Sequence, residues 1–312
     1  TSLSIMFFLE QPLIRTLEVF TAMPESMRRR QRSAWGDANR HGAIVDSFLE
    51  GPVFDTQGNL YVTDVPWGRV FRIDPQGAWT LVVEYDGEPN GMKFYDDTTL
   101  IITDYKQGLL SLDVTTGTIK PFLARRNSES FKGVNDLIFD ATGNIYFTDQ
   151  GQTGMHDPTG RLYRLSPDGK LDLLISNIPS PNGVALSPDE KVAFVGVTRG
   201  NCVWRMPLQT DGSVSKVNQF FTSYGSSGPD GLAVDTEGRL LVANPGLGYV
   251  WVLNIRGEPV EVLRGPVGSS ITNMAFGGPQ GKTLYVTNST DGQILRAEMS
   301  SAGLPVNRRT GA

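Results

Sequence analysis

Short stretches of alternating hydrophobic and polar residues, separated by turns that contain glycine, recur along the chain. The clearest unit has one stretch over 50–55, a second over 60–64 and a third over 69–74. The same layout returns at 135–165 and at 230–253, and weaker copies lie between and after these. Because β-branched and aromatic residues dominate the stretches, they predict strands of half-buried sheets. No amphipathic helical pattern of about ten residues separates them, which disfavours parallel βαβ units.

Each of the six units opens with a carboxylate or an amide side chain. Successive openers are about 45 residues apart, which is the repeat length of a β-propeller blade with three or four short strands. We therefore expect an all-β protein that folds as a six-bladed β-propeller. The six openers are Glu50, Asn90, Asn135, Asn182, Asp230 and Asn273.

The two ends of the chain do not form complete units. The segment 16–21 has the pattern of a strand, the basic run 27–32 has that of a solvated connection, and the last unit lacks a fourth strand. We expect the N-terminal strand to supply it, which closes the ring and removes a free sheet edge. The predicted division is an N-terminal extension with the closing strand over 1–43, a propeller domain over 44–299 and a polar tail over 300–312.

Composition and charge narrow the classes of partner. The chain has 28 basic and 33 acidic residues and a net charge of −5, which argues against nucleic acid because phosphate binding needs a basic surface. No stretch approaches the ~20 apolar residues of a membrane span, so no membrane is expected as a partner. The apolar stretch 4–9 is short and lacks a basic flank, so we expect no signal peptide and a cytoplasmic location. Cys202 is the single cysteine, which precludes an intrachain disulfide and predicts a buried, inert thiol.

The openers also predict a metal site. In a propeller the first strand of each blade lines the central channel, so the residues that begin these strands face one another at its mouth. Two carboxylates and two amide oxygens form a hard ligand set for one divalent cation. This set suits Ca²⁺ best, Mg²⁺ or Mn²⁺ less well, and Zn²⁺ least because zinc normally recruits His or Cys. The four candidate ligands are Glu50, Asn135, Asn182 and Asp230.

A simpler interpretation is that the openers followed by glycine are turn dipeptides at strand starts. Asn90 and Asn273 are compatible with this interpretation. Glu50 argues against it for the candidate ligands, because glutamate has no special turn chemistry and is costly to place near a channel without a partner. The set as a whole therefore favours the metal hypothesis.

Four phrases of the sequence are distinctive enough to compare with known families. They are LEGP at 49–52, VND at 134–136, SPNGVALSPDEK at 180–191 and GPDGLAVDTEG at 228–238. Together they resemble the SMP-30/gluconolactonase/LRE-like family over residues 44–298, and the stretch 49–73, which begins with the first phrase, is most similar to its drug-responsive lactonase branch. The resemblance implies a six-bladed propeller that holds one divalent cation through the residues matching the four candidate ligands. It also implies lactone hydrolysis, with Asp230 acting as a base as well as a ligand.

One position departs from the family pattern. Members that act on sugar-acid lactones carry an arginine two residues before the third-blade asparagine, where it contacts substrate hydroxyls. The residue at this position is Gly133. We therefore expect a lactone that is less polar than a sugar-acid lactone.

The resulting hypothesis is metal-dependent hydrolysis of a small-molecule lactone or ester. The metal polarises the ring carbonyl, and Asp230 accepts a proton from the attacking water. The sequence contains no G-x-S-x-G elbow, and its two histidines make a Ser-His-Asp triad a poor alternative. Substrate contacts are expected mainly from the loops between second and third strands. The residues expected to bind substrate are Trp67, Asn90, Tyr105, His156 and Arg199.

Two alternatives come from other classes. A non-catalytic propeller that binds a ligand, a protein or a polysaccharide would have neutral, interchangeable openers, and the mixed carboxylate and amide set argues against it. A metal-free enzyme resembling strictosidine synthase would share the ring but would need an acidic base elsewhere in the channel. Elemental analysis of the purified protein separates these alternatives. No feature of the sequence specifies an oligomeric state.

Overall fold

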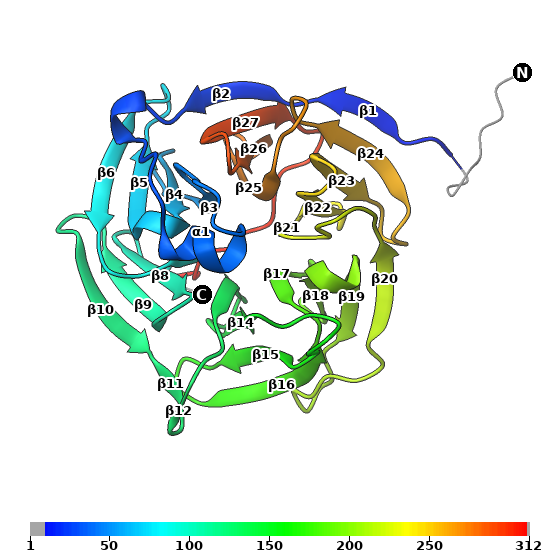
Figure 1. Cartoon of the computed structure of the whole chain (residues 1–312). Coiled ribbons are helices and arrows are strands. Elements are labelled where there is room, and N and C mark those ends of the chain that lie inside the picture. The colour runs from blue at the N-terminus through cyan, green and yellow to red at the C-terminus, as the bar shows by residue number, and fades with distance from the viewer. Residues whose placement is uncertain (1–9, 311–312) are drawn as a thin grey trace, which may run out of the picture.

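The structure is a computed structural model that describes residues 10–310, so the apolar stretch 4–9 lies outside the described residues. Six sheets surround a central axis like the blades of a propeller (Figure 1). Within each blade, consecutive strands are antiparallel neighbours and run from an inner strand near the axis to an outer strand. The prediction of an all-β, six-bladed propeller is confirmed.

Blades 1 to 3 follow one another along the chain. Blade 1 consists of β3 (Leu49–Phe54), β4 (Leu60–Asp64), β5 (Arg69–Ile73) and β6 (Trp79–Glu84). Blade 2 consists of β7 (Pro89–Phe94), β8 (Thr99–Asp104), β9 (Gly108–Asp113) and β10 (Thr118–Leu123). Blade 3 consists of β13 (Val134–Phe139), β14 (Ile145–Asp149), β15 (Gly160–Leu165) and β16 (Leu171–Ile178). A small hairpin of β11 (Arg125–Arg126) and β12 (Glu129–Ser130) lies between blades 2 and 3 along the chain.

Blades 4 to 6 repeat this arrangement. Blade 4 consists of β17 (Pro181–Leu186), β18 (Val192–Val197), β19 (Cys202–Pro207) and β20 (Asn218–Thr222). Blade 5 contains β21 (Leu232–Val234), β22 (Leu240–Asn244), β23 (Tyr249–Leu253) and β24 (Pro259–Arg264). The last part of the chain supplies three strands of blade 6, which are β25 (Ile271–Gly277), β26 (Thr283–Asn288) and β27 (Gln293–Glu298).

The N-terminal part of the chain closes the ring. Strand β2 (Glu18–Ala22) pairs antiparallel with β27 and forms the fourth strand of blade 6, with Val19 opposite Leu295. The expected closing strand is therefore confirmed. Strand β1 (Leu13–Thr16), which the sequence pattern did not predict, pairs parallel with β24 as a fifth strand of blade 5.

A short helical segment covers one end of the channel. After η1 (Glu25–Met27), helix α1 (Ala34–Asn39) lies over the centre of the ring (Figure 1). Ser33 caps this helix by accepting a hydrogen bond from the Gly36 N–H at 2.9 Å. The remaining helical turns, η2 (Val65–Trp67) and η3 (Thr198–Gly200), follow the second strands of blades 1 and 4. Within residues 10–310, no helix is both long enough and apolar enough to span a membrane.

The hydrophobic core is divided among the interfaces between neighbouring blades. Tyr61 of blade 1 packs edge to face on Phe94 of blade 2, with their ring centroids 5.3 Å apart. Ile138 of blade 3 and Val184 of blade 4 likewise belong to one buried cluster. Each blade is therefore held by apolar contacts with its neighbours, which keeps the inner strands in a fixed relation around the axis.

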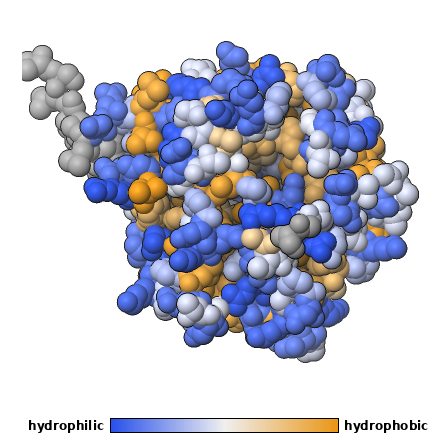
Figure 2. Space-filling model, turned by 180° about the vertical axis from the view of Figure 1, so that it is seen from behind, coloured by the Kyte–Doolittle hydropathy of each residue, from blue (hydrophilic) through white to orange (hydrophobic). Residues whose placement is uncertain are grey.

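The C-terminal segment 299–310 crosses the end of the channel opposite α1. The Leu304 N–H donates to the Val234 carbonyl of blade 5 at 3.0 Å, and the Arg308 N–H donates to the Phe94 carbonyl of blade 2 at 2.9 Å. Figure 2 shows the molecule from this side, where hydrophobic residues are visible between predominantly hydrophilic ones. The two ends of the channel are thus covered by segments from opposite ends of the chain.

Candidate metal centre at the channel mouth

The openers lie where the inner strands begin, at the end of the channel that α1 covers. In five blades a β-bulge lies at the opener, such as the register shift between Glu50 and Val53 in blade 1. Bulges re-aim individual side chains, and this placement directs the openers towards the channel. Five of the openers line one cavity of about 120 Å³, here called the mouth cavity. These five are Glu50, Asn90, Asn135, Asn182 and Asp230.

The glycines that follow the openers permit close contact between blades. A Cβ added to Gly183 would lie 2.4 Å from the carbonyl oxygen of Asp230, and one added to Gly231 would lie 2.1 Å from Asn273 Oδ1. Real side chains cannot approach that closely. Glycine is therefore required at these positions, where the opener of the next blade packs against the inner strand. Gly183 is part of strand β17 rather than of a turn. Close packing, not turn chemistry, therefore explains glycine at these two positions.

Hydrogen bonds from the amide nitrogens orient the two candidate asparagine ligands. Asn182 Nδ2 donates to Thr198 Oγ1 at 3.1 Å, and Asn135 Nδ2 donates to Gln150 Oε1 at 2.7 Å. Because an amide carries its donor and its acceptor on opposite arms, holding the nitrogen fixes the direction of the oxygen. The amide oxygens are the atoms left to accept a ligand in the mouth cavity.

Glu50 is held by its own backbone and by the opener of blade 6. Its Oε2 accepts hydrogen bonds from the Gly51 N–H at 2.7 Å and from Asn273 Nδ2 at 2.9 Å. The same Asn273 nitrogen is 3.4 Å from Asp136 Oδ2. Asn273 therefore does more than the turn interpretation allowed, because it holds one candidate ligand in place across the boundary between blades 6 and 1.

Unpaired oxygens test whether these residues fit a cation. Among residues 10–310, the buried side-chain atoms without a hydrogen-bond partner include Asn90 Oδ1, Asn182 Oδ1 and Asp230 Oδ1. Each unsatisfied buried polar atom costs ~1–3 kcal/mol, and three such oxygens at one cavity are compatible with a positively charged ligand. No group of three or more His, Cys, Asp or Glu side chains within the described residues could hold a metal. A cation here would therefore depend on amide oxygens, and the donor set fits a hard divalent ion.

Three buried carboxyl groups lie close enough to affect one another. Burial and then the charge of Asp136 raise the pKa of Glu50 to about 7. Burial, followed by the charges of Glu50 and Asp136, raises the pKa of Asp230 well above its usual value. Burial also raises the pKa of Asp136, although Lys93 opposes this increase. Like charges in a buried cluster are costly without a counter-charge, which a cation in the mouth cavity would supply.

Two arginines add positive charge at the mouth cavity. Arg40, which follows α1, and Arg199, in η3, both line it. The Arg40 guanidinium lies 5.4 Å from the ring centroid of Trp35 and 5.1 Å from that of Phe48. Burial and the neighbouring Arg199 lower the pKa of Arg40, whereas Asp230 raises it. This arrangement favours a ligand that carries or develops negative charge.

Threonines near the ends of second strands attach one blade to the opener of the next. Their side chains are buried, and each hydroxyl donates to the backbone carbonyl of an opener. We call this set the threonine belt. Its bonds run from Thr63 to Asn90 (2.8 Å), from Thr103 to Asn135 (2.5 Å) and from Thr148 to Asn182 (2.6 Å).

The aspartates that follow these threonines hold their own blades. Asp64 Oδ1 accepts the Phe48 N–H at 2.8 Å, and Asp149 Oδ1 accepts the Gly133 N–H at 2.8 Å. Both donors lie two residues before an opener. Asp64 also forms a buried ion pair with Arg69 at 2.6 Å. These hydrogen bonds fix the chain segments that lead into the openers.

The residues predicted to contact substrate occupy different places. Tyr105 and Arg199 line both the mouth cavity and an adjoining cavity of about 490 Å³, here called the vestibule, which His156 also lines. Asn90 lines the mouth cavity. The Trp67 indole N–H instead donates to the Asp46 carbonyl at 3.1 Å, and Trp67 lines neither cavity. The structure therefore brings together four of these five residues.

Several residues at the site were not among the predicted ones. Asp136 follows the opener of unit three where units one, two, four and five have glycine, and this exception was visible in the sequence. Gln150 and Thr198 contact candidate ligands, but nothing in their local sequence marks those contacts. Arg40 lies in the N-terminal extension, outside the repeat, so comparison of the units could not reveal it.

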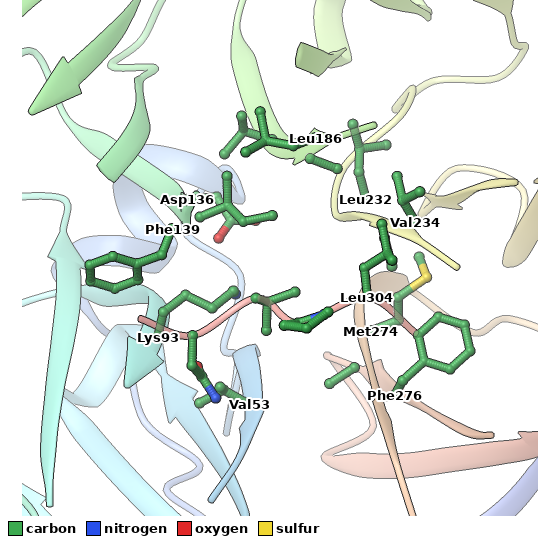
Figure 3. A pocket seen from close by; sticks show the side chains of 18 of the residues that line it. Val53, Lys93, Asp136, Phe139, Leu186, Leu232, Val234, Met274, Phe276 and Leu304 are labelled. Atoms are coloured by element: carbon green, nitrogen blue, oxygen red, sulfur yellow. The ribbon is translucent and has the colours of Figure 1, made fainter. Parts of the chain in front are cut away.

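A second, mainly apolar cavity lies on the other side of the openers. It has a volume of about 210 Å³ and is closed by the C-terminal segment (Figure 3). Asp136 and Lys93 are charged residues in its lining. The hydrophobic lining residues labelled in Figure 3 are Val53, Phe139, Leu186, Leu232, Val234, Met274, Phe276 and Leu304. Of the six openers, Asn273 lines this second cavity, and the other five line the mouth cavity on the α1 side.

Comparison with known proteins supports the assignment of this architecture to a family. The sequence matches the SMP-30/Gluconolactonase/LRE-like region over residues 48–290. It is 34% identical over 226 residues to the lactonase drp35 of Staphylococcus aureus (strain MRSA252), with 68% of each chain covered.

Two solved structures share the fold. Regucalcin from Agrobacterium tumefaciens, described as a calcium-binding protein, is 22% identical with a TM-score of 0.74 and covers 93% of this chain and 98% of its own. A gluconolactonase from Xanthomonas campestris is also 22% identical, with a TM-score of 0.72, and covers 93% of this chain and 99% of its own. These two similarities concern the fold. The sequence match, which extends over most of the propeller, shows that the chain belongs to the SMP-30/gluconolactonase/LRE-like family.

Proposed function

We propose that this protein is a lactonase that uses one divalent cation, Ca²⁺ in the first instance, to convert a lactone into the corresponding hydroxy acid. The proposal is carried by the convergence of two carboxylates and two amides, with unpaired oxygens, in one buried cavity. It is supported by the name lactonase for the relative from Staphylococcus aureus. The description of the regucalcin from Agrobacterium tumefaciens as calcium-binding agrees with the choice of cation.

The chain provides a ligand set and a proton acceptor. Glu50, Asn135, Asn182 and Asp230 would hold the cation, which supplies Lewis-acid polarisation of the lactone carbonyl when bound. Asp230 accepts a proton from the water that attacks the carbonyl carbon. It returns this proton to the ring oxygen as the C–O bond breaks, which leaves a carboxylic acid and an alcohol on one molecule. Arg40 stabilises the negative charge that the product carries after ionisation.

The wall beside the third opener favours a less polar substrate. A Cβ added to Gly133 would lie 2.8 Å from the ring of Tyr105, so this ring fills the space that a side chain at position 133 would need. The Tyr105 hydroxyl donates to the Gly151 carbonyl, which fixes the ring there. An aromatic surface thus takes the place of the arginine of sugar-acid lactonases, and we infer an aliphatic or aromatic lactone as substrate.

The proposal is tested with chelator-treated protein. We expect elemental analysis of the untreated protein to find one equivalent of a divalent metal, and calorimetric titration of the treated protein to show one Ca²⁺ site. Glu50→Gln weakens this site because it removes a ligand charge. Asp230→Asn abolishes hydrolysis across a panel of aromatic, aliphatic and sugar-acid lactones, while circular dichroism shows an unchanged fold.

Asp235→Asn is the matched control for Asp230→Asn. Asp235 is a buried carboxylate in the same blade, paired with Arg239 at 2.7 Å, and does not line the mouth cavity. We expect this variant to retain lactone hydrolysis. Near-normal turnover by Asp230→Asn would refute the base assignment, and a protein that binds no divalent metal would refute the cation site.

A further inference from the structure

Thr198 connects two of the candidate ligands through one buried hydroxyl. Its Oγ1 accepts a hydrogen bond from Asn182 Nδ2 at 3.1 Å and donates one to the Pro229 carbonyl at 2.8 Å. Pro229 directly precedes Asp230. The belt threonines bind the backbone of an opener, whereas Thr198 holds the side chain of one opener and the backbone of the residue before the next.

The contact with Asn182 determines which arm of the amide faces the mouth cavity. With Nδ2 held by Thr198, Oδ1 is the remaining arm, and it is buried without a hydrogen-bond partner among residues 10–310. If the amide rotated by half a turn, it would present an NH₂ group, which repels a cation. The Thr198 hydroxyl therefore selects the orientation of Asn182 that can act as a ligand.

The contact with Pro229 acts on Asp230 through the backbone. The Asp230 N–H donates to the Ala243 carbonyl at 2.8 Å, and the Asp230 carbonyl accepts from the Gly183 N–H at 3.1 Å. The hydrogen bond from Thr198 to the Pro229 carbonyl is a third contact, which holds the peptide group between Pro229 and Asp230. Because the same hydroxyl makes both contacts, a displacement of Thr198 would move both ligands relative to each other.

We propose that Thr198 is a positioning residue that sets the affinity of the mouth cavity for its divalent cation by orienting Asn182 and Asp230 together. This inference rests on the proposed cation site and adds a residue that does not itself bind the cation. Removing outer-shell partners of metal ligands typically lowers metal affinity by about 10–100-fold. We expect an effect of that size from the loss of the Thr198 hydroxyl.

The experiment compares Ca²⁺ affinities by calorimetric titration of chelator-treated, full-length protein. Thr198→Val keeps the shape of the side chain and removes both hydrogen bonds, so its dissociation constant for Ca²⁺ should rise by about 10–100-fold. Thr198→Ser keeps the hydroxyl and should bind Ca²⁺ nearly as tightly as the wild type. If Thr198→Val does not fold, Thr198→Cys, a weaker hydrogen-bonding group of similar size, takes its place with the same expected loss.

Thr21 provides a matched control far from the mouth cavity. Its hydroxyl, on strand β2, also donates to a backbone carbonyl, that of Gly77 at 2.7 Å, and accepts a side-chain N–H, that of Trp79 at 3.0 Å. Thr21→Val loses the same pair of bonds and should keep wild-type affinity for Ca²⁺. An equal loss of affinity in this variant would overturn the proposal, because general destabilisation would then explain both results.

A double-mutant cycle tests whether Thr198 acts through Asn182. In an Asn182→Ala background, Thr198→Val should weaken Ca²⁺ binding much less than it does in the wild type. Equal effects in the two backgrounds would overturn this route. If the wild type binds Ca²⁺ and Thr198→Val binds it equally well, the positioning role is refuted while the cation site stands. If the wild type itself binds no Ca²⁺, Mg²⁺ or Mn²⁺, the proposed function fails first.

Discussion

Replacing Thr148 with valine tests whether the threonine belt stabilises the ring. Thr148 is fully buried, and its hydroxyl donates to the Asn182 carbonyl at 2.6 Å while accepting the Asp136 N–H at 3.2 Å. Valine has almost the same shape, so the substitution removes these two hydrogen bonds without creating a cavity. It therefore isolates the contribution of the hydroxyl from that of packing.

The expected loss follows from the number of backbone groups that lose their partner. A buried polar group left unpaired costs ~1–3 kcal/mol, and the longer bond to the Asp136 N–H contributes at the low end. We expect Thr148→Val to lower the free energy of unfolding by about 2–4 kcal/mol. Thr63→Val removes one bond, to the Asn90 carbonyl at 2.8 Å, and should cost about 1–2 kcal/mol. Thr148→Ser keeps the hydroxyl and should cost about 1 kcal/mol for the lost methyl group.

Urea unfolding in the presence of a chelator measures these differences, since cation binding would otherwise add its own stabilisation. The midpoint should fall in the order wild type, Thr148→Ser, Thr63→Val, Thr148→Val, with an unchanged dependence on urea concentration. The reasoning is refuted if Thr148→Val unfolds within about 0.5 kcal/mol of the wild type. It is also refuted if Thr63→Val costs more than Thr148→Val.

Two further predictions concern single positions. Burial raises the pKa of Cys202 to about 11, so at pH 8 about one thiol in a thousand is ionised. Mass spectrometry should find the native protein unmodified by iodoacetamide while the urea-unfolded protein is alkylated; rapid alkylation of the native protein would contradict this. Gly133→Arg forces its Cβ against the Tyr105 ring and should lower stability by about 1–3 kcal/mol without adding sugar-acid lactone hydrolysis. The double variant Gly133→Arg/Tyr105→Ala should lose less stability than the sum of the losses in the two single variants. Strictly additive losses would show that the contact between position 133 and the Tyr105 ring is unimportant.

The repeated parts of the fold and the closing strand could be predicted from the sequence, whereas the other unrepeated parts could not. Six units in register specify six blades, and the missing strand of the last unit specifies what the N-terminal segment must supply. Strand β1 has four residues and pairs with β24, whose partner residues follow it by more than two hundred positions. Helix α1 has six residues, which is too short for a helical period to be recognised. Both elements are placed by tertiary contacts that local sequence does not encode.

The residues of the candidate site likewise include some that the sequence could predict and some that it could not. Glu50, Asn135, Asn182 and Asp230 could be recognised because equivalent positions in a ring face one axis, and the structure places all four at one cavity. The repeated Thr-Asp pairs were also visible in the sequence. Their partners, however, lie in the next blade or before the opener of the same blade, and residue spacing does not identify them. Trp67, whose loop position suggested a substrate contact, lies apart from the other predicted residues, with its indole N–H bonded to the Asp46 carbonyl.

The boundary between blades 5 and 6 departs from the belt in a way that bears on the proposed chemistry. Blade 5 has Ala243, and blade 4 has Gly196, where blades 1, 2, 3 and 6 have a threonine. The Ala243 N–H donates to the Gly231 carbonyl at 2.9 Å, and the Ala243 carbonyl accepts the Asp230 N–H at 2.8 Å. Asp230 is thus fixed by its backbone, and its Oδ1 has no hydrogen-bond partner among residues 10–310. The amide of Asn182, in contrast, is held by a hydroxyl. Hydrogen bonds to a carboxylate stabilise its charge and make it a weaker proton acceptor, so a free oxygen suits a base better than a passive ligand. In the proposed mechanism, the asparagines would therefore act as rigidly held ligands, and Asp230 Oδ1 would remain available to accept a proton.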